Sequence, residues 1–271
     1  MRTRYYSPQL DRIVYLDERP TPEFWDARWN AEGWTGISRQ DEMITEVTAL
    51  HLPAGARVLE GGCGRGNKVK ALYDSGFAAT GVDFAAESVR QARRVYPHLD
   101  IREGDVRHLP FPSGHFDGYW SLGVIEHFWT GYDAILAEAS RVLKPGGMLF
   151  LTAPWLSPCR RFAVRRGVLP TRDFDAEPGD FYQFALGRQE VRAALKRHGF
   201  DPLHWRGLAP EVCLLEDFLA IRKPAHWLFG SRGSPAKRIL RRMIVALTRD
   251  VCGHAFLTIS RRRLLRGVES H

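Results

Sequence analysis

The chain has 271 residues, 44% of them hydrophobic, and a formal net charge of +8. This length suits one sizeable α/β core, and the hydrophobic content excludes a disordered chain. No apolar run approaches the ~18 residues of a membrane-spanning helix, and the N-terminus lacks the apolar core of a signal peptide. We therefore expect a cytoplasmic protein. The net charge indicates an acidic partner only weakly.

The cysteines are scattered along the chain and form no C-x-x-C pair. They stand at Cys63, Cys159, Cys213 and Cys252. This spacing argues against a zinc site and against a disulfide framework, and it suits a reducing compartment. We expect no bound metal.

Residues 1–52 are expected to form an aromatic, helical N-terminal cap. The stretch 22–30 contains Trp25 and Trp29, and in 40–50 the apolar residues recur at helical spacing. This second segment can bury one face on the rest of the domain.

The most informative stretch is residues 57–66, RVLEGGCGRG, in which an apolar strand leads into an acid and closely spaced glycines. Glycine lets the backbone turn tightly and approach a ligand. The third glycine comes one residue too early for the G-x-G-x-x-G spacing of dinucleotide sites. Glu60 would repel a nearby diphosphate and can accept hydrogen bonds from an ammonium group. The loop therefore favours a cationic, amino-acid-like nucleoside.

Two further acids follow predicted strands. Asp83 ends the strand 78–83, where a carboxylate can accept two hydrogen bonds from a ribose diol. Asp105 ends a third predicted strand within 100–106. Strands alternate with helical patterns from 57 to 152, which predicts a doubly wound, Rossmann-like α/β fold with helices on both faces of a parallel sheet. Ligands of such sheets bind beyond the carboxyl ends of the strands, where these acids fall.

The order of these signals resembles that of class I S-adenosylmethionine-dependent methyltransferases, whose first motif is E/D-x-G-x-G-x-G. The resemblance is close over about 55–155. It includes the turn, fourth strand and acid–histidine pair in 111–127 and the proline–glycine stop and fifth strand in 141–152. It implies a mostly parallel seven-stranded sheet and S-adenosylmethionine as cofactor. The cofactor-binding residues that it implies are Glu60, Gly62, Cys63, Gly64, Gly66, Asp83, Phe84, Asp105, Val106, Ser121 and Leu122.

His127 is the candidate general base. The resemblance places it just past the fourth strand, beside Glu126, and histidine is the commonest base near neutral pH. The alternative is structural: the pair could simply begin the next helix, with the acid favoured by the helix dipole.

We expect a single domain over 1–271, with a cofactor-binding half at 53–153 and a C-terminal half at 188–271. The sixth strand is expected at 200–206 and the last at 254–260. Residues 154–187 form a lid-like insertion, because a long loop on the cofactor rim is usually a lid or binding segment. The alternative is a structural clasp that packs its aromatic residues on the core.

A second insertion, 208–253, is basic and amphipathic. In a helix over 235–249, Ile239, Leu240, Met243, Ile244 and Leu247 share one face, opposite Lys237, Arg238, Arg241 and Arg242. This pattern is typical of a helix on an anionic membrane surface. It is equally the pattern of an ordinary helix that packs on the domain and exposes a basic back, and this interpretation is the commoner one.

The resemblance implies methyl transfer to a small-molecule or lipid-linked acceptor, on oxygen. Nucleic acid is disfavoured as partner, because the fourth strand ends in Ser121-Leu-Gly-Val and lacks the signature of enzymes that methylate base amino groups. Two alternatives remain open: a scaffold that keeps the fold without turnover at a membrane or partner surface, and an RNA methyltransferase that uses the basic surface.

Overall fold

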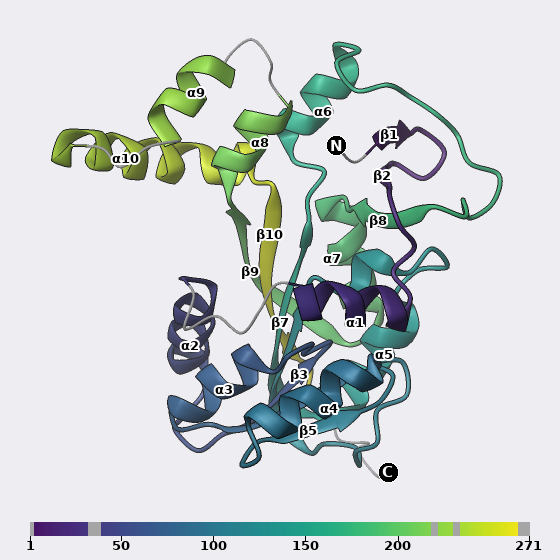
Figure 1. Ribbon diagram of the computed structural model, residues 1–271, viewed down its shortest axis with the longest axis vertical. Coiled ribbons are helices and arrows are strands. Elements are labelled where there is room, and N and C mark those ends of the chain that lie inside the picture. The colour runs from purple at the N-terminus through teal and green to yellow at the C-terminus, as the bar shows by residue number, and fades with distance from the viewer. Residues whose placement is uncertain (1–2, 32–38, 218–221, 230–233, 265–271) are drawn as a thin grey trace, which may run out of the picture.

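The computed structural model describes residues 3–31, 39–217, 222–229 and 234–264. Its centre is a seven-stranded sheet in the order β5-β4-β3-β6-β7-β10-β9 (Figure 1). The strands are β3 (Arg57–Gly61), β4 (Ala78–Asp83), β5 (Asp100–Glu103), β6 (Phe116–Leu122), β7 (Leu143–Pro154), β9 (Phe200–Leu208) and β10 (Ala255–Arg262). The first five run parallel, whereas β10 is antiparallel to both of its neighbours. The predicted Rossmann-like fold class is confirmed.

Helices cover both faces of the sheet. They are α2 (Arg39–His51), α3 (Asn67–Asp74), α4 (Ala86–Val95), α5 (Asp133–Val142) and α7 (Arg188–Arg197). Successive strand residues point to opposite faces, and β3 illustrates the consequence. Val58 packs in one core cluster with Val69 and Leu72 of α3, and Leu59 packs in the other with Leu136 of α5. This alternation of buried residues explains the helical layer on each face.

The N-terminal region differs from the helical cap that we expected. Residues Thr3–Ser7 (β1) and Arg12–Leu16 (β2) form an antiparallel hairpin, and β2 pairs with β8 (Phe181–Ala185) in a second, three-stranded sheet. Only α1 (Pro22–Ala31) and α2 are helical in the described part of 1–52. The cause is the run Ile13-Val14-Tyr15, whose β-branched and aromatic side chains suit a buried strand.

The insertion 154–187 contains α6 (Pro158–Arg165) and β8. Its aromatic residues Phe174, Phe181 and Phe184 lie in the main core cluster, whereas Phe162 is exposed. The two ends of this segment and Phe174 are therefore packed on the core, as in the clasp alternative, whereas most of residues 165–180 are exposed.

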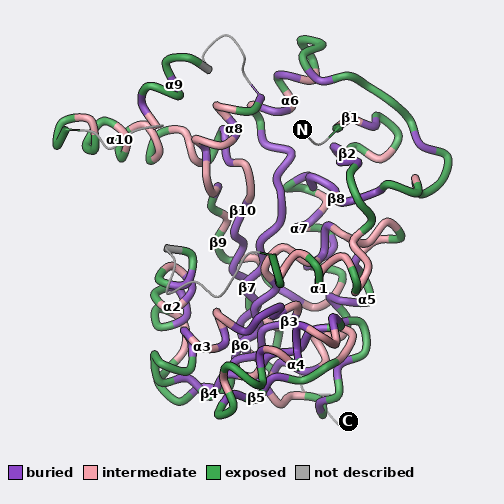
Figure 2. The backbone as a smooth tube through the Cα atoms, in the orientation of Figure 1, coloured by how far each residue is buried: buried purple, intermediate pink, exposed green. Residues whose placement is uncertain are grey.

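The second insertion forms α8 (Pro210–Asp217), α9 (Arg222–Phe229) and α10 (Pro235–Cys252). Helices α9 and α10 project from the body as an arm, largely exposed or half-buried in Figure 2. Of the two alternatives for this helix, packing of its apolar face on the domain does not hold for four of the five residues, since Ile239, Leu240, Met243 and Leu247 are exposed. In the part of the chain that the structure describes, no helix has the length and apolar character needed to cross a bilayer.

The structure also corrects the expectation about cysteines. A disulfide joins Cys159 of α6 to Cys252 at the end of α10, across 93 residues of sequence. The spacing along the chain did not indicate this pair because tertiary folding alone brings the two helices together. Cys63 and Cys213 are free and buried.

Candidate functional site

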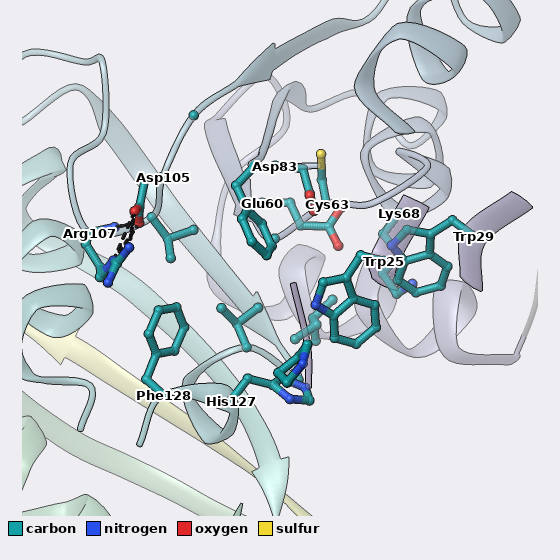
Figure 3. Close-up of a pocket in the computed structure, with 18 residues that line it drawn as sticks. Trp25, Trp29, Glu60, Cys63, Lys68, Asp83, Asp105, Arg107, His127 and Phe128 are labelled. Carbon is teal, nitrogen blue, oxygen red and sulfur yellow. Dashed lines mark hydrogen bonds and ion pairs between the residues drawn. The ribbon is translucent and has the colours of Figure 1, made fainter. Parts of the chain in front are cut away.

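A cavity of about 200 Å³ lies at the carboxyl ends of the parallel strands (Figure 3). It lies where open α/β sheets bind their ligands. Nine of the predicted site residues line it: Glu60, Gly62, Cys63, Asp83, Phe84, Asp105, Val106, Leu122 and His127. Gly64 and Gly66 belong to the loop beneath the cavity, and they are not among the residues that line it. Ser121 is buried in β6 and does not line it either, since its strand position turns its side chain into the core.

Glu60 brings a buried carboxyl group to the cavity at the end of β3. Its Oε2 atom has no hydrogen-bond partner among the described residues. Burial raises the pKa of Glu60 to about 8, although the nearby charge of Lys68 acts in the opposite direction. Burying a carboxyl oxygen without a hydrogen-bond partner is costly. A cationic ligand would supply both the charge and the hydrogen bonds that it lacks.

The glycine loop leaves no room for side chains. Gly64 has a positive φ of 50°, and a Cβ built on it would lie 2.9 Å from the indole of Trp29. Its backbone N–H donates to Asp83 Oδ2 at 2.7 Å, and the N–H of Ala85 donates to Asp83 Oδ1 at 2.9 Å. These bonds hold the Asp83 carboxylate at the cavity wall. Each oxygen keeps a further lone pair, so the carboxylate can still accept from the two hydroxyls of a ribose.

Asp105 is paired with an arginine that the sequence did not single out. Arg107 donates from Nη2 to Asp105 Oδ2 at 2.6 Å, and its guanidinium lies 5.2 Å from the centre of the Phe128 ring. Burial acts to raise the pKa of Asp105, but the hydrogen bonds from Arg107 outweigh it and the pKa is lowered. Figure 3 shows this ion pair beside Phe128 at the cavity edge. A ligand amino group at Asp105 would share the carboxylate with Arg107.

Two tryptophans of α1 also line the cavity. The rings of Trp25 and Trp29 are stacked with centroids 5.6 Å apart, and Arg65 lies 5.6 Å above the Trp29 ring. The sequence showed these aromatics as part of the N-terminal cap. It carried no signal for their place at the cavity, because α1 reaches it only through tertiary packing against α4.

The imidazole of His127 is held from both sides. It lies in the short 3₁₀ helix η1 (Ile125–His127), and its ring contacts Trp25 and Tyr182 edge to face, with centroids about 5 Å apart. The Nδ1 atom lies 2.7 Å from the carbonyl oxygen of Tyr182. A carbonyl only accepts, so Nδ1 must carry the hydrogen, and in the neutral ring Nε2 is the acceptor. This tautomer suits a general base.

A second cavity of about 430 Å³ adjoins the first. The two share Trp25, Trp29, Cys63, Lys68, Gly123 and His127 along their walls. Glu126 lines the second cavity only, and burial raises its pKa to about 8. His127 therefore stands at the boundary between the two spaces.

The Cys63 thiol does not have the character of a nucleophile, and the described residues hold no cluster of potential metal ligands. No group of three potential metal ligands occurs within the residues that the structure describes. Burial raises the pKa of the Cys63 thiol well above its usual range, so this side chain stays neutral.

The central part of the chain is similar to known methyltransferases. Residues 59–151 match a family described as a methyltransferase domain. A Mycolicibacterium smegmatis protein named "probable S-adenosylmethionine-dependent methyltransferase" is 32% identical over 163 residues, which cover 60% of this chain and 58% of that protein. The fatty-acid O-methyltransferase of the same organism is 35% identical over 102 residues, 36% of this chain and 37% of that one. The chain thus spans less than two thirds of the length of these relatives.

A solved structure agrees on the fold. The crystal structure of the cyclase SpnF matches with a TM-score of 0.59 and 19% identity, over 92% of this chain and 98% of that chain. At this identity the match shows the fold alone, and the same fold supports more than one reaction. By sequence, residues 59–151 are thus similar to a methyltransferase domain, and the matching relative is named as one that depends on S-adenosylmethionine.

Proposed function

We propose that the protein is a methyltransferase that transfers the methyl group of S-adenosylmethionine to oxygen on a small-molecule or lipid-linked acceptor. The observation that carries this proposal is the position of two groups on one cavity. Glu60 offers an unpartnered buried carboxyl oxygen there, and His127 presents an imidazole whose tautomer is fixed by Tyr182. The first suits a cationic cofactor and the second suits proton removal from an acceptor.

The cavity residues fit the cofactor in three places. Glu60 would face its ammonium group, Asp83 would accept from its ribose hydroxyls, and Val106 and Phe84 offer apolar surface to its base. When bound, S-adenosylmethionine supplies an electrophilic methyl group on a sulfonium. The chain needs no metal for such a displacement, because positioning and exclusion of water provide much of the rate enhancement.

His127 would act on the acceptor. An oxygen nucleophile of high pKa must lose its proton as it reacts, and Nε2 of His127 is the atom that would take it. The hydrogen bond from Nδ1 to Tyr182 would hold the ring in place and stabilise the charge that the ring gains. The indoles and Phe128 around this position would keep water away from the reacting groups.

The acceptor class follows from the walls of the cavity and from one relative. Trp25, Trp29, Val124 and Phe128 give the cavity an apolar lining near His127. Apolar walls with a few placed polar groups suit small organic ligands. A related protein is named a fatty-acid O-methyltransferase, which supports an acceptor with an apolar body and an oxygen at the reacting end.

The test is turnover with S-adenosylmethionine and a panel of phenols, fatty acids and their lipid-linked forms. Release of S-adenosylhomocysteine together with an acceptor that gains one methyl group on oxygen is the expected result. If S-adenosylhomocysteine binds but no acceptor in the panel is methylated, the scaffold alternative gains the support that the enzyme proposal loses.

A further inference from the structure

The arm formed by α9 and α10 exposes an apolar stripe on one side. We define the apolar stripe as Ile239, Met243, Leu247 and Val251 with Leu240 beside them, and these five side chains are between 42% and 77% exposed. At about 100° per residue they occupy an arc of about 120° on α10. Most amphipathic helices bury such a face against another surface. An exposed apolar face of this size therefore indicates a binding surface.

The opposite side of α10 faces the protein. The helix packs on α6, α8, α9 and β9, and the side chain of Arg241 donates from Nε to the carbonyl oxygen of Leu228 in α9. A groove beside the helix is lined by both basic and apolar residues, namely Glu211, Phe229, Arg238, Arg241, Arg242, Val245, Ala246 and Arg249. The helix therefore contacts the domain on the side of the half-buried Arg241 and Arg249, its apolar stripe faces outward, and the exposed Arg242 lies between the two sides.

Basic side chains border the apolar stripe along the helix. Lys237 precedes it on one edge, and Arg242 lies on the other by helical spacing. From 222 to 249 the sequence contains eight Lys or Arg and no Asp or Glu. Asp250, at the C-terminal end of the stripe, accepts from the backbone N–H of Gly207 and pairs with Arg249. Apolar and cationic groups on one helix complement a layer whose interior is apolar and whose surface is anionic.

An aromatic residue of the neighbouring helix adds to this match. Trp227 of α9 is 65% exposed, and the Nζ atom of Lys237 lies 4.5 Å from the centre of its ring. The contact places the indole at the N-terminal end of the apolar stripe, beside a cation. Tryptophan is favoured at the boundary between lipid chains and headgroups, where one end of the ring is apolar and the other is wet.

We propose that the arm docks on an anionic lipid bilayer, with the apolar stripe and Trp227 in the headgroup boundary and the flanking Lys and Arg side chains on lipid phosphates. A helix of this kind lies in the plane of the interface and does not span the bilayer. A second copy of the chain with the two α10 helices parallel is a poorer occupant, because Lys237 and Arg242 would then lie toward their own copies. This inference does not rest on the proposed function, since binding to lipid needs neither cofactor nor acceptor.

The experiment is co-sedimentation of the full chain with vesicles. Phosphatidylcholine vesicles with about 30% phosphatidylserine should retain the protein at roughly 0.1 M salt, and pure phosphatidylcholine vesicles should not. The double variant Met243→Asp with Leu247→Asp should lose at least tenfold in affinity, since both side chains are exposed and the fold does not need them. Replacing Arg242 by Gln should weaken binding about fivefold, the loss expected for one basic group near the surface.

The matched control carries the same kind of change elsewhere. Leu50 of α2 and Val168 are 80% and 54% exposed and lie outside the arm, so Leu50→Asp with Val168→Asp should leave retention as in the wild type. Equal retention of the arm variant and the wild type would overturn the proposal. Failure of the wild-type protein to bind anionic vesicles would also overturn it. In that case, if light scattering shows a wild-type dimer that the arm variant cannot form, the occupant of the apolar stripe is a second copy of the chain.

Discussion

Nδ1 of His127 lies 2.7 Å from the carbonyl oxygen of Tyr182, a residue of the insertion strand β8 that also pairs with the N-terminal hairpin. This hydrogen bond links the second sheet to the rim of the cofactor half. It fixes which nitrogen of the ring carries the hydrogen, so the position of Nε2 as acceptor depends on a segment far away in sequence.

Removing the base should slow chemistry without loss of cofactor binding. We predict that His127→Ala lowers kcat by ~10²-fold or more and leaves the Kd of S-adenosylhomocysteine unchanged. His127→Asn is the sharper variant, because its amide N–H can still donate to the Tyr182 carbonyl while no nitrogen base remains. Steady-state turnover checks both variants. A wild-type kcat in His127→Asn would remove His127 from the mechanism.

The buried carboxyl of Glu60 should make stability depend on pH. Its pKa is about 8 in the folded protein and near 4.5 when unfolded, so between these values the folded state keeps a proton that the unfolded state has lost. Stability therefore falls as pH rises through this window, by at most about 1.4 kcal/mol per pH unit from this group. Glu60→Gln should flatten the profile of urea unfolding measured from pH 5 to 8.

Glu126→Gln separates the effect of a buried carboxyl group on stability from its effect on cofactor binding. Burial raises the pKa of Glu126 to about 8 as well, so Glu126→Gln should flatten the stability profile in the same direction. Only Glu60 is expected to meet the cofactor's ammonium group. Calorimetry in buffers of different ionisation enthalpy should therefore show proton release on binding of S-adenosylhomocysteine at pH 7 in the wild type and in Glu126→Gln, but not in Glu60→Gln. Unchanged release in Glu60→Gln would contradict this assignment.

The pair of Arg160 and Asp217 should be the most sensitive ion pair in the described part of the chain. Both are almost fully buried, with Arg160 Nε 2.8 Å from Asp217 Oδ2, and Arg160 also donates to the carbonyl oxygens of Trp155 and His254. Asp217→Ala leaves a buried guanidinium without its counter-charge, so we expect a loss of about 3–5 kcal/mol in the free energy of unfolding. The exposed pair of Asp201 and Arg263 is the control, and Asp201→Ala should cost at most about 1 kcal/mol. If Asp217→Ala and Asp201→Ala lose equal free energy of unfolding in urea, other groups must compensate the charge of Arg160.

Titration of free thiols tests the disulfide directly. Under denaturing, non-reducing conditions a thiol reagent should titrate the two free cysteines, Cys63 and Cys213, and not Cys159 or Cys252. Replacing Cys159 and Cys252 together by Ser should lower stability by roughly 2–4 kcal/mol, since the bond closes a long loop in the unfolded chain. Titration of all four thiols in the oxidised protein would exclude the bond.

Much of the cofactor half could be predicted from sequence because its signals are local. The glycine loop after β3 and the acids after β4 and β5 are set by a few neighbouring residues, and parallel strands bring their carboxyl ends to one edge. For this reason Glu60, Asp83 and Asp105 were expected at one cavity, and the structure places all three there.

The rest depends on contacts between distant parts of the chain. Pairing of Ile13 with Ala185 creates the second sheet, and neither segment alone shows its partner. The same limit hid Trp25 and Trp29, whose place at the cavity depends on how α1 packs. Arg107 lay two residues from a predicted site residue, yet its guanidinium could equally have pointed to solvent. These were failures of tertiary information, whereas the hairpin strand at Ile13-Val14-Tyr15 was a local pattern that the helical-cap prediction missed.

The central claim is that the cavity binds the cofactor through Asp83, and thermal unfolding tests it most directly. S-adenosylhomocysteine at 100 times its Kd should add about 2.7 kcal/mol and raise Tm by roughly 5–10 °C in the wild type. The shift should vanish in Asp83→Ala and persist in Asp74→Ala, an exposed acid of the adjacent helix α3. No shift in the wild type, or an equal shift in Asp83→Ala, would contradict the account.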